Sequence, residues 1–395
     1  MTPQTYRLLI VSPVPVSIEN GIYQSLDLWV EDLQANLAYV SELTLISPRA
    51  DQAIIKTYTE KLLPSSIKVI LHDQVSGEDD LKLIISQHDV VSIGVGAPAW
   101  RMKIAIQVAK LSVKLRRCLI ISVSSNRAKT TLMNATHQSW LKKIKSHIVA
   151  WSIQHTTNYL VRISSGVFVV GEGVRQSMHF AHKNIYVETA AWVNEQNIIN
   201  DTNFANKLHS IQNGLPAAII ATRLEPMKGV YLAIDALIEI KKQAPKLPKL
   251  SILGNGPLLK DLQLMVKKFD LSNQITFDGV RAYPEEFFAE LARFHLILLT
   301  NLNDEQPRLI FDSISQGLIP VCPDSSAYQY LKLPPEIMYE KGNAASLAKT
   351  WISLCDKNTY MRAMLQLRPF AIEYTINNMH RKRNIWIRQS LASSQ

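Results

Sequence analysis

Two acidic residues eight positions apart, Asp304 and Asp312, follow an apolar run, Leu296–Leu299, that predicts a buried parallel strand. Pro307 suits the first position of a helix, because its missing N–H costs nothing there, and Gly317 suits the cap that ends it. The N-terminus of such a helix attracts anions. The stretch therefore predicts carboxylates beside an anion site, or, in the plainer interpretation, a capped surface helix with incidental acids.

Arg223 and Lys228 form a second candidate group, on the loop that follows a predicted strand at 216–221. A guanidinium offers paired donors to a phosphate, and an ammonium acts as a point charge. Each charge-assisted hydrogen bond contributes on the order of 1.5–3 kcal/mol. An amphipathic helix is expected over 230–242. The loop therefore predicts a clamp for two phosphates.

These two stretches resemble retaining family 4 glycosyltransferases of the GT-B fold. The resemblance rests on Arg223, Pro226, Lys228 and Gly229 in one loop, and on the acid pair with the run from Gly317 to Val321 in the other. It covers residues 215–345 well and the first half only by architecture. It implies an α/β protein with two Rossmann-like domains facing a central cleft, and a C-terminal helix that crosses back to the first domain.

By this resemblance, the chain is a retaining, metal-independent hexosyltransferase that needs no cofactor beyond its nucleoside diphosphate sugar. Arg223 and Lys228 would hold the leaving diphosphate, Asp304 would face the donor sugar, and Asp312 would accept hydrogen bonds from the ribose. The sequence has no Asp-x-Asp metal motif. The further donor-binding positions that the resemblance implies are Gly254, Gly256, Gly279, Val280, Glu305, Pro307, Arg308 and Leu309.

The chain departs from the family at three places. The usual glutamate pair is two aspartates, and Ser124 and Asn126 stand where relatives carry a histidine near the transferred sugar. Only Gly21 remains in a loop that is glycine-rich in relatives, and a structural turn is its competing role. Gly21, Ser124 and Asn126 are the acceptor-side candidates. The departures also support an alternative, a degenerate GT-B protein that binds a nucleotide or glycan as a partner subunit.

The run from Gly94 to Ala99 spells Gly-x-Gly-x-x-Ala after a strand, so an NAD(P)-dependent oxidoreductase is a third hypothesis. A dinucleotide site of this type needs an acid about twenty residues further on. Residues 112–126 contain no acid, and Pro98 stands where helix N–H groups should point. Arg116 or Arg117 would have to take a 2′-phosphate in the NADP version.

The formal charge of +10 predicts acidic partners. From residue 90 to residue 171 there is no Asp or Glu, yet there are twelve Lys and Arg residues. An apolar stripe with lysines beside it fits a helix on an anionic membrane, or a helix packed on the sheet with solvated lysines. Nucleic acid is not predicted, because aromatic residues are not interleaved as stacking platforms. The stripe consists of Trp140, Leu141, Ile144, Ile148 and Trp151.

Length and composition predict two domains: 395 residues with 47% apolar side chains. We expect an acceptor-side basic domain at 1–195, a linker at 196–214, a nucleotide-sugar domain at 215–370 and a returning helix at 371–395. No apolar run is long enough to span a membrane, and three scattered cysteines form no metal or disulfide pattern. A cytoplasmic protein, peripheral on the inner face of the membrane, is expected.

The predicted function is transfer of a sugar from a nucleoside diphosphate donor, with retention. The expected acceptor is a lipid-linked saccharide or an envelope or exopolysaccharide precursor. The expected partners are therefore the nucleotide sugar, the saccharide or lipid-linked acceptor and an anionic membrane surface contacted by the basic N-terminal domain.

Overall fold

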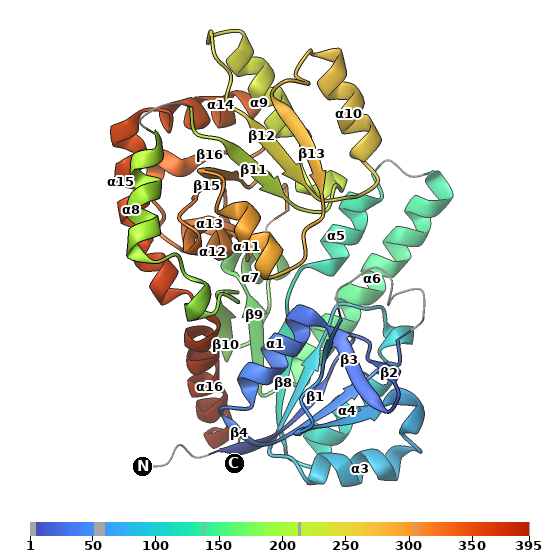
Figure 1. Cartoon of the computed structure of the whole chain (residues 1–395). Coiled ribbons are helices and arrows are strands. Elements are labelled where there is room, and N and C mark those ends of the chain that lie inside the picture. Colours follow the sequence, from blue (N-terminus) through green and yellow to red (C-terminus); the bar gives the residue numbers. More distant parts are fainter. Residues whose placement is uncertain are drawn as a thin grey trace. The chain divides into compact units, whose positions relative to one another are not determined.

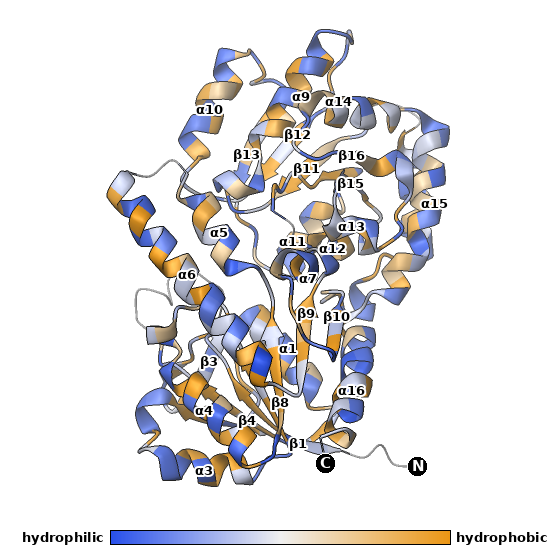
Figure 2. Ribbon diagram, turned by 180° about the vertical axis from the view of Figure 1, so that it is seen from behind, coloured by the Kyte–Doolittle hydropathy of each residue, from blue (hydrophilic) through white to orange (hydrophobic). Residues whose placement is uncertain are grey.

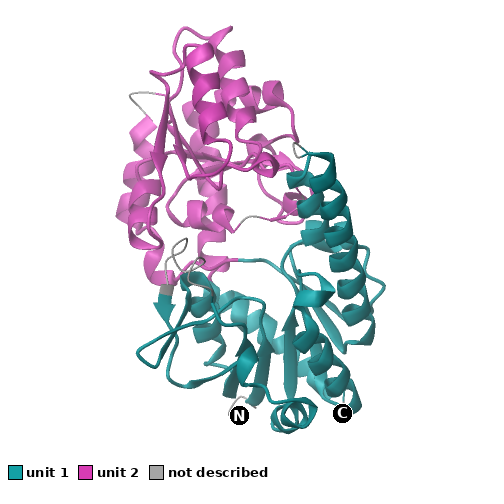
Figure 3. Ribbon diagram, turned by 90° about the vertical axis from the view of Figure 1, so that its right-hand side faces the viewer, with its two compact units in different colours: residues 1–190, 376–395 teal, residues 191–375 magenta. Residues whose placement is uncertain are grey.

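The computed structural model describes residues 5–50, 60–136, 139–211, 215–303, 305, 306 and 308–394. The chain forms two compact units. Unit 1 consists of Met1–Ala190 and Ile376–Gln395, and unit 2 of Ala191–Thr375 (Figure 3). The chain therefore crosses between the units at 190/191 and again at 375/376, and the range 196–214, expected as a linker, lies within unit 2.

Unit 1 is built on a seven-stranded parallel sheet of order β10-β9-β8-β7-β1-β4-β6 (Figure 1). The strands are β1 Tyr6–Val11, β4 Val40–Ser47, β6 Ile67–Leu71, β7 Val90–Gly94, β8 Cys118–Val123, β9 Gly166–Val170 and β10 Ile185–Glu188. The helices are α1 Asp27–Asn36, α3 Glu78–Ser86, α4 Lys103–Lys114, α5 Arg127–Asn134, α6 Trp140–Ile163, α7 Glu172–Met178 and α16 Ile376–Ala392, with 3₁₀ turns η1 His72–Gln74 and η2 Ala99–Arg101.

Both faces of this sheet are covered. Leu9 and Val11 of β1 belong to one core with residues of α3, α4, α6 and α7, whereas Leu8 and Ile10 belong to another with residues of α1 and α16. The alternation of side chains along a strand explains the two cores. Sheet strands of unit 1 such as β1, β4 and β8 are accordingly coloured as hydrophobic over most of their length (Figure 2).

A small antiparallel sheet includes the segment that carries Gly21, which was expected as a loop. It contains β2 Ser17–Glu19, β3 Ile22–Leu26 and β5 Glu60–Leu62. Asn20 and Gly21 connect β2 and β3 with positive φ angles of 50° and 77°. Two central residues with φ above zero form the turn that matches the twist of a two-residue hairpin.

Unit 2 is built on a six-stranded parallel sheet of order β13-β12-β11-β14-β15-β16. Counted along the unit, this is 3-2-1-4-5-6, the order of the Rossmann fold. The strands are β11 Ala218–Ala221, β12 Leu250–Leu253, β13 Ile275–Gly279, β14 Leu296–Leu298, β15 Ile319–Asp324 and β16 Met338–Glu340. Both units are thus Rossmann-like α/β domains, as predicted.

The helices of unit 2 alternate with its strands. They are α8 Asp201–Ser210, α9 Tyr231–Lys241, α10 Leu259–Lys268, α11 Glu285–Leu291, α12 Leu309–Ser315, α13 Ser326–Gln329, α14 Ala344–Ser353 and α15 Lys357–Glu373, with 3₁₀ turns η3 Glu195–Asn197, η5 Pro226–Lys228 and η6 Pro335–Ile337. The range expected as a linker therefore contains η3 and α8. Gly317 follows α12 in the predicted left-handed conformation, at φ 68°.

The C-terminal helix α16 belongs to unit 1, although α15 just before it belongs to unit 2. Trp386 of α16 donates its indole N–H to Asn184 Oδ1 at 2.8 Å, and the Tyr6 hydroxyl of β1 donates to Asn384 Oδ1. The helix therefore returns to the first domain, as the fold prediction requires.

Among the residues described, no helix combines the length and the apolar character that crossing a membrane requires.

Candidate functional site

The loop after β11 contacts the loop after β14 directly. The Thr300 hydroxyl donates to the carbonyl oxygen of Lys228 at 2.7 Å, and the Leu302 N–H donates to the carbonyl of Met227 at 2.8 Å. β11 and β14 are neighbours in the sheet at the point where the strand order reverses. Ligands of open α/β sheets bind outside the carboxyl ends of the strands at this point.

Gly229 makes this contact possible. Its φ is 59°, and a Cβ atom there would lie 2.4 Å from the carbonyl oxygen of Thr300. A residue with a side chain would be strained by the backbone angle and would push the two loops apart. Lys228, the last residue of η5, is partly buried beside this contact, whereas Arg223 is exposed and pairs with Glu225 at 3.1 Å. Both predicted phosphate-binding cations thus lie at the switch point.

The loop after β12 is joined to the loop after β11 on its other side. The Leu224 N–H donates to the carbonyl of Asn255 at 3.0 Å, and the Leu258 N–H donates to the carbonyl of Leu224 at 3.1 Å. A Cβ atom on Gly254, whose φ is 134°, would lie 1.8 Å from the Thr222 oxygen. A Cβ atom on Gly256 would lie 2.6 Å from the Leu224 oxygen. The predicted glycines Gly254 and Gly256 thus allow close approach of two backbones.

Gly279 is the last residue of β13, the strand beyond β12, and Val280 follows it. The Gly254 N–H donates to the Gly279 carbonyl at 2.6 Å, so this strand end adjoins the glycine loop. Gly279 has a φ of 71°, and no atom lies within 4 Å of the place of its Cβ. The Val280 side chain is 71% exposed. These two residues therefore form an open edge next to the glycine loop.

The loop after β14 is a buried polar network. The Asn301 amide donates to the carbonyls of Asn303 and Glu305, each at 3.3 Å, and the Tyr328 hydroxyl donates to Asn301 Oδ1 at 2.7 Å. The Tyr330 hydroxyl donates to Gln306 Oε1. The Nδ2 atom of Asn303 and the Nε2 atom of Gln306 are buried, and no described residue forms a hydrogen bond with either atom. Buried donors of this kind cost free energy unless a ligand or water satisfies them.

Arg308, which precedes α12, lies between two aromatic rings. Its guanidinium carbon is 5.3 Å from the centre of the Trp192 ring and 4.7 Å from that of Tyr283. The Nε atom lies 3.7 Å from Asp312 Oδ2, and the buried Nη1 atom has no hydrogen-bond partner in the part of the chain that the structure describes. Cation–π contacts hold such a group in one orientation. Arg308 is thus a fixed cation of unit 2 with an unused donor.

Asp312 lies inside α12 and is 1% exposed. Burial raises the pKa of its carboxyl to about 6, and the neighbouring Arg308 guanidinium opposes that rise. Neither carboxyl oxygen has a hydrogen-bond partner among the described residues. A buried carboxyl with free acceptors suits hydrogen bonds from hydroxyl groups of a ligand. The hydroxyl-binding role expected for Asp312 stays a prediction.

Asp304 and Pro307 lie outside the described residues. Of their predicted neighbours, Glu305 offers its carbonyl to Asn301, and Leu309 is the first residue of α12. The structure therefore brings Arg223, Lys228, Glu305, Arg308 and Asp312 to one end of the unit 2 sheet. The role of Asp304 in facing the donor sugar stays a prediction.

The acceptor-side candidates belong to unit 1. Gly21 is the second residue of the β2–β3 hairpin turn, a structural position. Asn126 caps α5: its Oδ1 accepts from the Lys129 N–H at 3.0 Å, and its Nδ2 donates to Ser177 Oγ at 3.2 Å. Ser124 is exposed after β8. The Asn126 side chain is thus engaged in local structure, and Ser124 alone of the three is an exposed hydroxyl on a strand end.

The Gly94–Ala99 pattern does not lead into a helix in the way a dinucleotide site requires. The 3₁₀ turn η2 follows Pro98, and α4 begins only at Lys103. A Cβ atom on Gly96 would lie 3.0 Å from Arg127 Cγ, so α5 covers this glycine. The glycines therefore serve chain packing here.

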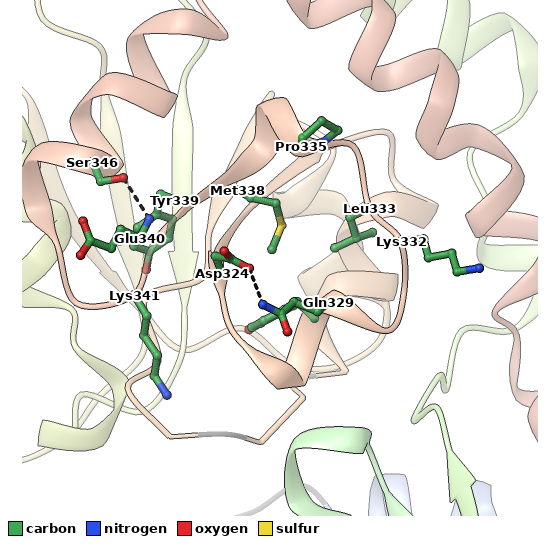
Figure 4. Close-up of a pocket in the computed structure, with 11 residues that line it drawn as sticks. Asp324, Gln329, Lys332, Leu333, Pro335, Met338, Tyr339, Glu340, Lys341 and Ser346 are labelled. Carbon is green, nitrogen blue, oxygen red and sulfur yellow. Dashed lines mark hydrogen bonds between the residues drawn. The ribbon is translucent and has the colours of Figure 1, made fainter. Parts of the chain in front are cut away.

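A pocket of about 540 Å³ lies at the carboxyl ends of β15 and β16 (Figure 4). Met338, Lys332 and Lys341 line it, and Gln329 donates to Asp324 Oδ1 at 2.9 Å across it. The pocket adjoins the β14 loop through Tyr328, which also lines it. None of the predicted site residues lines this pocket.

No cluster of three or more His, Cys, Asp or Glu side chains suited to a metal occurs among the described residues. The three cysteines are free thiols, with Cys118 and Cys322 buried and Cys355 partly buried.

Sequence reasoning missed Trp192, Tyr283, Asn303 and Gln306. The two aromatic residues lie 91 positions apart, and no local pattern relates them to Arg308. Asn303 and Gln306 carried a signal, since polar residues directly after a buried strand are often functional.

Comparisons with known proteins agree with this arrangement. Residues 201–366 match the family model for glycosyl transferases group 1. The chain is 24% identical over 273 residues to a GDP-mannose-dependent alpha-(1-6)-phosphatidylinositol monomannoside mannosyltransferase of Mycolicibacterium smegmatis. That alignment covers 65% of this chain and spans 64% of the relative's length.

Solved structures share the fold. Anabaena Alr3699/HepE in complex with UDP is similar at a TM-score of 0.65 and 14% identity, over 98% of this chain and 100% of that one. WaaG, a glycosyltransferase involved in lipopolysaccharide biosynthesis, is similar at a TM-score of 0.62 and 10% identity. That similarity covers 96% of this chain and 99% of WaaG. The chain therefore has the GT-B fold, and its residues 201–366 match the model of the glycosyl transferases group 1 family.

Proposed function

We propose that the chain transfers a sugar, of hexosyl type and with retention of configuration, from a nucleoside diphosphate donor to an acceptor. The observation that carries this proposal is the hydrogen-bonded junction between the Arg223–Lys228 loop and the loop that leads to Arg308 and Asp312. It gathers cations and a carboxyl at the switch point of one Rossmann-like domain.

The cations would act on the leaving group. As the anomeric C–O bond breaks, negative charge grows on the diphosphate, and preoriented donors stabilise it most strongly. Arg223 and Lys228 are assigned to the phosphates, with the N–H groups near Leu309. Fixed cations would thus stabilise the leaving diphosphate in place of a divalent metal.

The acids would act on the rest of the donor. Asp312 is assigned to the ribose hydroxyls, since its two oxygens are buried and unpartnered. Asp304 is assigned to the donor sugar, where a carboxylate favours the positive charge of an oxocarbenium-like transition state. Both assignments, like retention, follow the family resemblance.

The proposed acceptor is a lipid-linked saccharide or an envelope or exopolysaccharide precursor, met by unit 1 at the cytoplasmic face of a membrane. The Mycolicibacterium relative is named for a phosphatidylinositol mannoside acceptor, and WaaG for lipopolysaccharide biosynthesis. The excess of cations in unit 1 supports an anionic surface as the partner.

The test is donor turnover by purified variants. UDP-glucose and GDP-mannose are tried first, because relatives are named with UDP and GDP-mannose. Arg223→Ala and Lys228→Ala should each lower turnover by about 10²–10³, the scale for one charge-stabilising donor. Lys242→Ala is the matched control, since Lys242 and Arg223 are each 61% exposed and each pair with a glutamate, and it should keep full turnover.

Unchanged turnover in both test variants would remove the phosphate clamp. Nucleotide binding by thermal shift, without any hydrolysis or transfer, would instead favour the degenerate GT-B subunit. The two aspartates in place of glutamates and the missing histidine are the observations that keep that second candidate in view.

A further inference from the structure

Helix α6, Trp140–Ile163, exposes a continuous apolar face. Five large apolar side chains on it are between 50% and 69% exposed: Trp140, Leu141, Ile144, Ile148 and Trp151. At about 100° per residue, all five fall within roughly a 100° arc of the helix surface. We call these five residues the α6 apolar face. Single exposed apolar residues are ordinary, but a contiguous set marks an interaction site.

The opposite side of α6 already anchors the helix in unit 1. Ala150 and Ile153 are buried in one cluster with Ala128 of α5, and Leu160 and Val161 belong to the core under the sheet. The Ala99 N–H donates to Ser152 Oγ at 3.0 Å. The exposed residues are therefore not needed to attach α6 to its own domain, which leaves them for another contact.

The charge around this face has one sign. Lys142, Lys143 and Lys145 lie within the same two turns and are exposed. No Asp or Glu occurs between residues 90 and 171, so no acid of α4, α5 or α6 offsets them. Figure 2 colours α6 in alternating hydrophobic and hydrophilic segments. An apolar face with several cations on the other sides of the same helix is the pattern of a helix that lies in a membrane interface.

The aromatic residues are placed to match such an interface. Trp140 and Trp151 lie at the two ends of the face, and tryptophan is the side chain that prefers the boundary between headgroups and acyl chains. A second copy of this chain fits less well. A two-fold contact places the same patch on both sides, so the lysines of one copy would meet the lysines of the other.

We propose that the α6 apolar face inserts into the surface of an anionic lipid bilayer, with Lys142, Lys143 and Lys145 binding its phosphate headgroups. This inference deepens the membrane part of the proposed function by naming the surface. It does not depend on sugar transfer, because lipid binding is measured without donor or acceptor.

The experiment is co-sedimentation of the full chain with vesicles of phosphatidylcholine alone, or with about a third phosphatidylglycerol. Wild-type protein should bind the anionic vesicles, with affinity that falls as salt rises. Ile148→Glu should weaken this binding roughly 10²-fold, because it removes buried apolar area and adds repulsion. Changing Lys142, Lys143 and Lys145 together to Gln should weaken binding to anionic vesicles by a similar factor.

Helix α10 supplies matched controls. Leu264 is 64% exposed, so Leu264→Glu carries the same change as Ile148→Glu at an equally exposed helical site. Lys260, Lys267 and Lys268 are exposed on the same helix, and their joint change to Gln matches the lysine variant. Both controls should bind vesicles as the wild type does. All variants should keep the wild-type melting temperature, since every altered side chain is at the surface.

Three results would overturn the proposal. The first is equal binding to neutral and anionic vesicles, and the second is wild-type binding by Ile148→Glu. The third is a wild-type dimer in light scattering that becomes a monomer in Ile148→Glu, with no vesicle binding by either, which would make the face a subunit interface. Loss of nucleotide turnover with intact vesicle binding would instead count only against the proposed transferase.

Discussion

The Nε atom of Arg308 lies 3.7 Å from the Oδ2 atom of Asp312, one turn further along the chain at α12. The cation is held over Trp192 and Tyr283, and the carboxyl is buried. The Nη1 donor and both carboxyl oxygens form no hydrogen bond with any residue that the structure describes. One side of unit 2 thus keeps a donor and two acceptors unused, which is the condition for a polar ligand to gain affinity there.

The buried Asp312 carboxyl makes stability depend on pH. Burial raises its pKa to about 6, above its value of about 3.9 in the unfolded chain. The native state therefore holds this proton more tightly than the unfolded chain does. The stability that the protonated carboxyl contributes is fully present below about pH 4 and is lost as pH rises through about 6. Across that window the loss is about 3 kcal/mol. Asp312→Asn should remove this dependence, as measured by urea unfolding at a series of pH values.

The quantity to follow is the difference in the free energy of unfolding between wild type and Asp312→Asn. The variant should gain stability relative to wild type as pH rises from 4 to 7. Asp270→Asn, at a side chain that is 95% exposed, should show no such trend. A constant difference between wild type and Asp312→Asn at every pH would show that the carboxyl is not perturbed.

Removing the Arg308 side chain should destabilise unit 2 by about 1–3 kcal/mol. The change deletes two cation–π contacts and leaves the Asp312 carboxyl without its nearby cation. Arg308→Lys should recover only part of this, because an ammonium keeps the charge but not the flat stacking surface. Thermal unfolding should give melting temperatures that fall in the order wild type, Arg308→Lys, Arg308→Ala. A wild-type melting temperature for Arg308→Lys would show that charge alone matters.

Gly254 and Gly279 both have positive φ angles, but an added Cβ atom would clash with a neighbouring loop only at Gly254. Gly254→Ala should cost about 3 kcal/mol or more, because its Cβ would lie 1.8 Å from the Thr222 oxygen and force the β11 and β12 loops apart. Gly279→Ala should cost only about 1–2 kcal/mol, since strain is its sole penalty there. Denaturant unfolding measures both, and equal costs would mean that the β11–β12 junction yields easily.

The contact between α16 and the rest of unit 1 depends on Arg383. Its guanidinium binds Glu188 at 2.8 and 2.6 Å, and its Nη2 lies 3.1 Å from Asp32 Oδ1. Arg383→Met would leave two buried carboxylates without their cation and should cost about 3–5 kcal/mol. Arg381→Met, at an exposed site on the same helix, is the control and should melt as the wild type does. Equal melting temperatures of Arg383→Met and Arg381→Met would contradict a stabilising role of Arg383.

Several features follow from local sequence alone. The runs that became β11 and β14 were predicted as strands because apolar residues precede a polar loop in each case. Gly317 caps α12 as predicted, since only a local backbone angle was needed. The structural turn named as one of two roles for Gly21 is the β2–β3 hairpin turn, and Asn-Gly is a strong signal for such a turn.

What the sequence determined by itself is the alternation of strands and helices, the concentration of cations in the first half, and the residue types of each loop. These follow from local periodicity and composition. Only the tertiary structure decided that β11 lies beside β14, that the Lys228 carbonyl meets Thr300, and that Trp192 and Tyr283 enclose Arg308. A side-chain pattern records which face of an element is buried, whereas strand neighbours and ring contacts depend on pairing between residues that are distant in the chain.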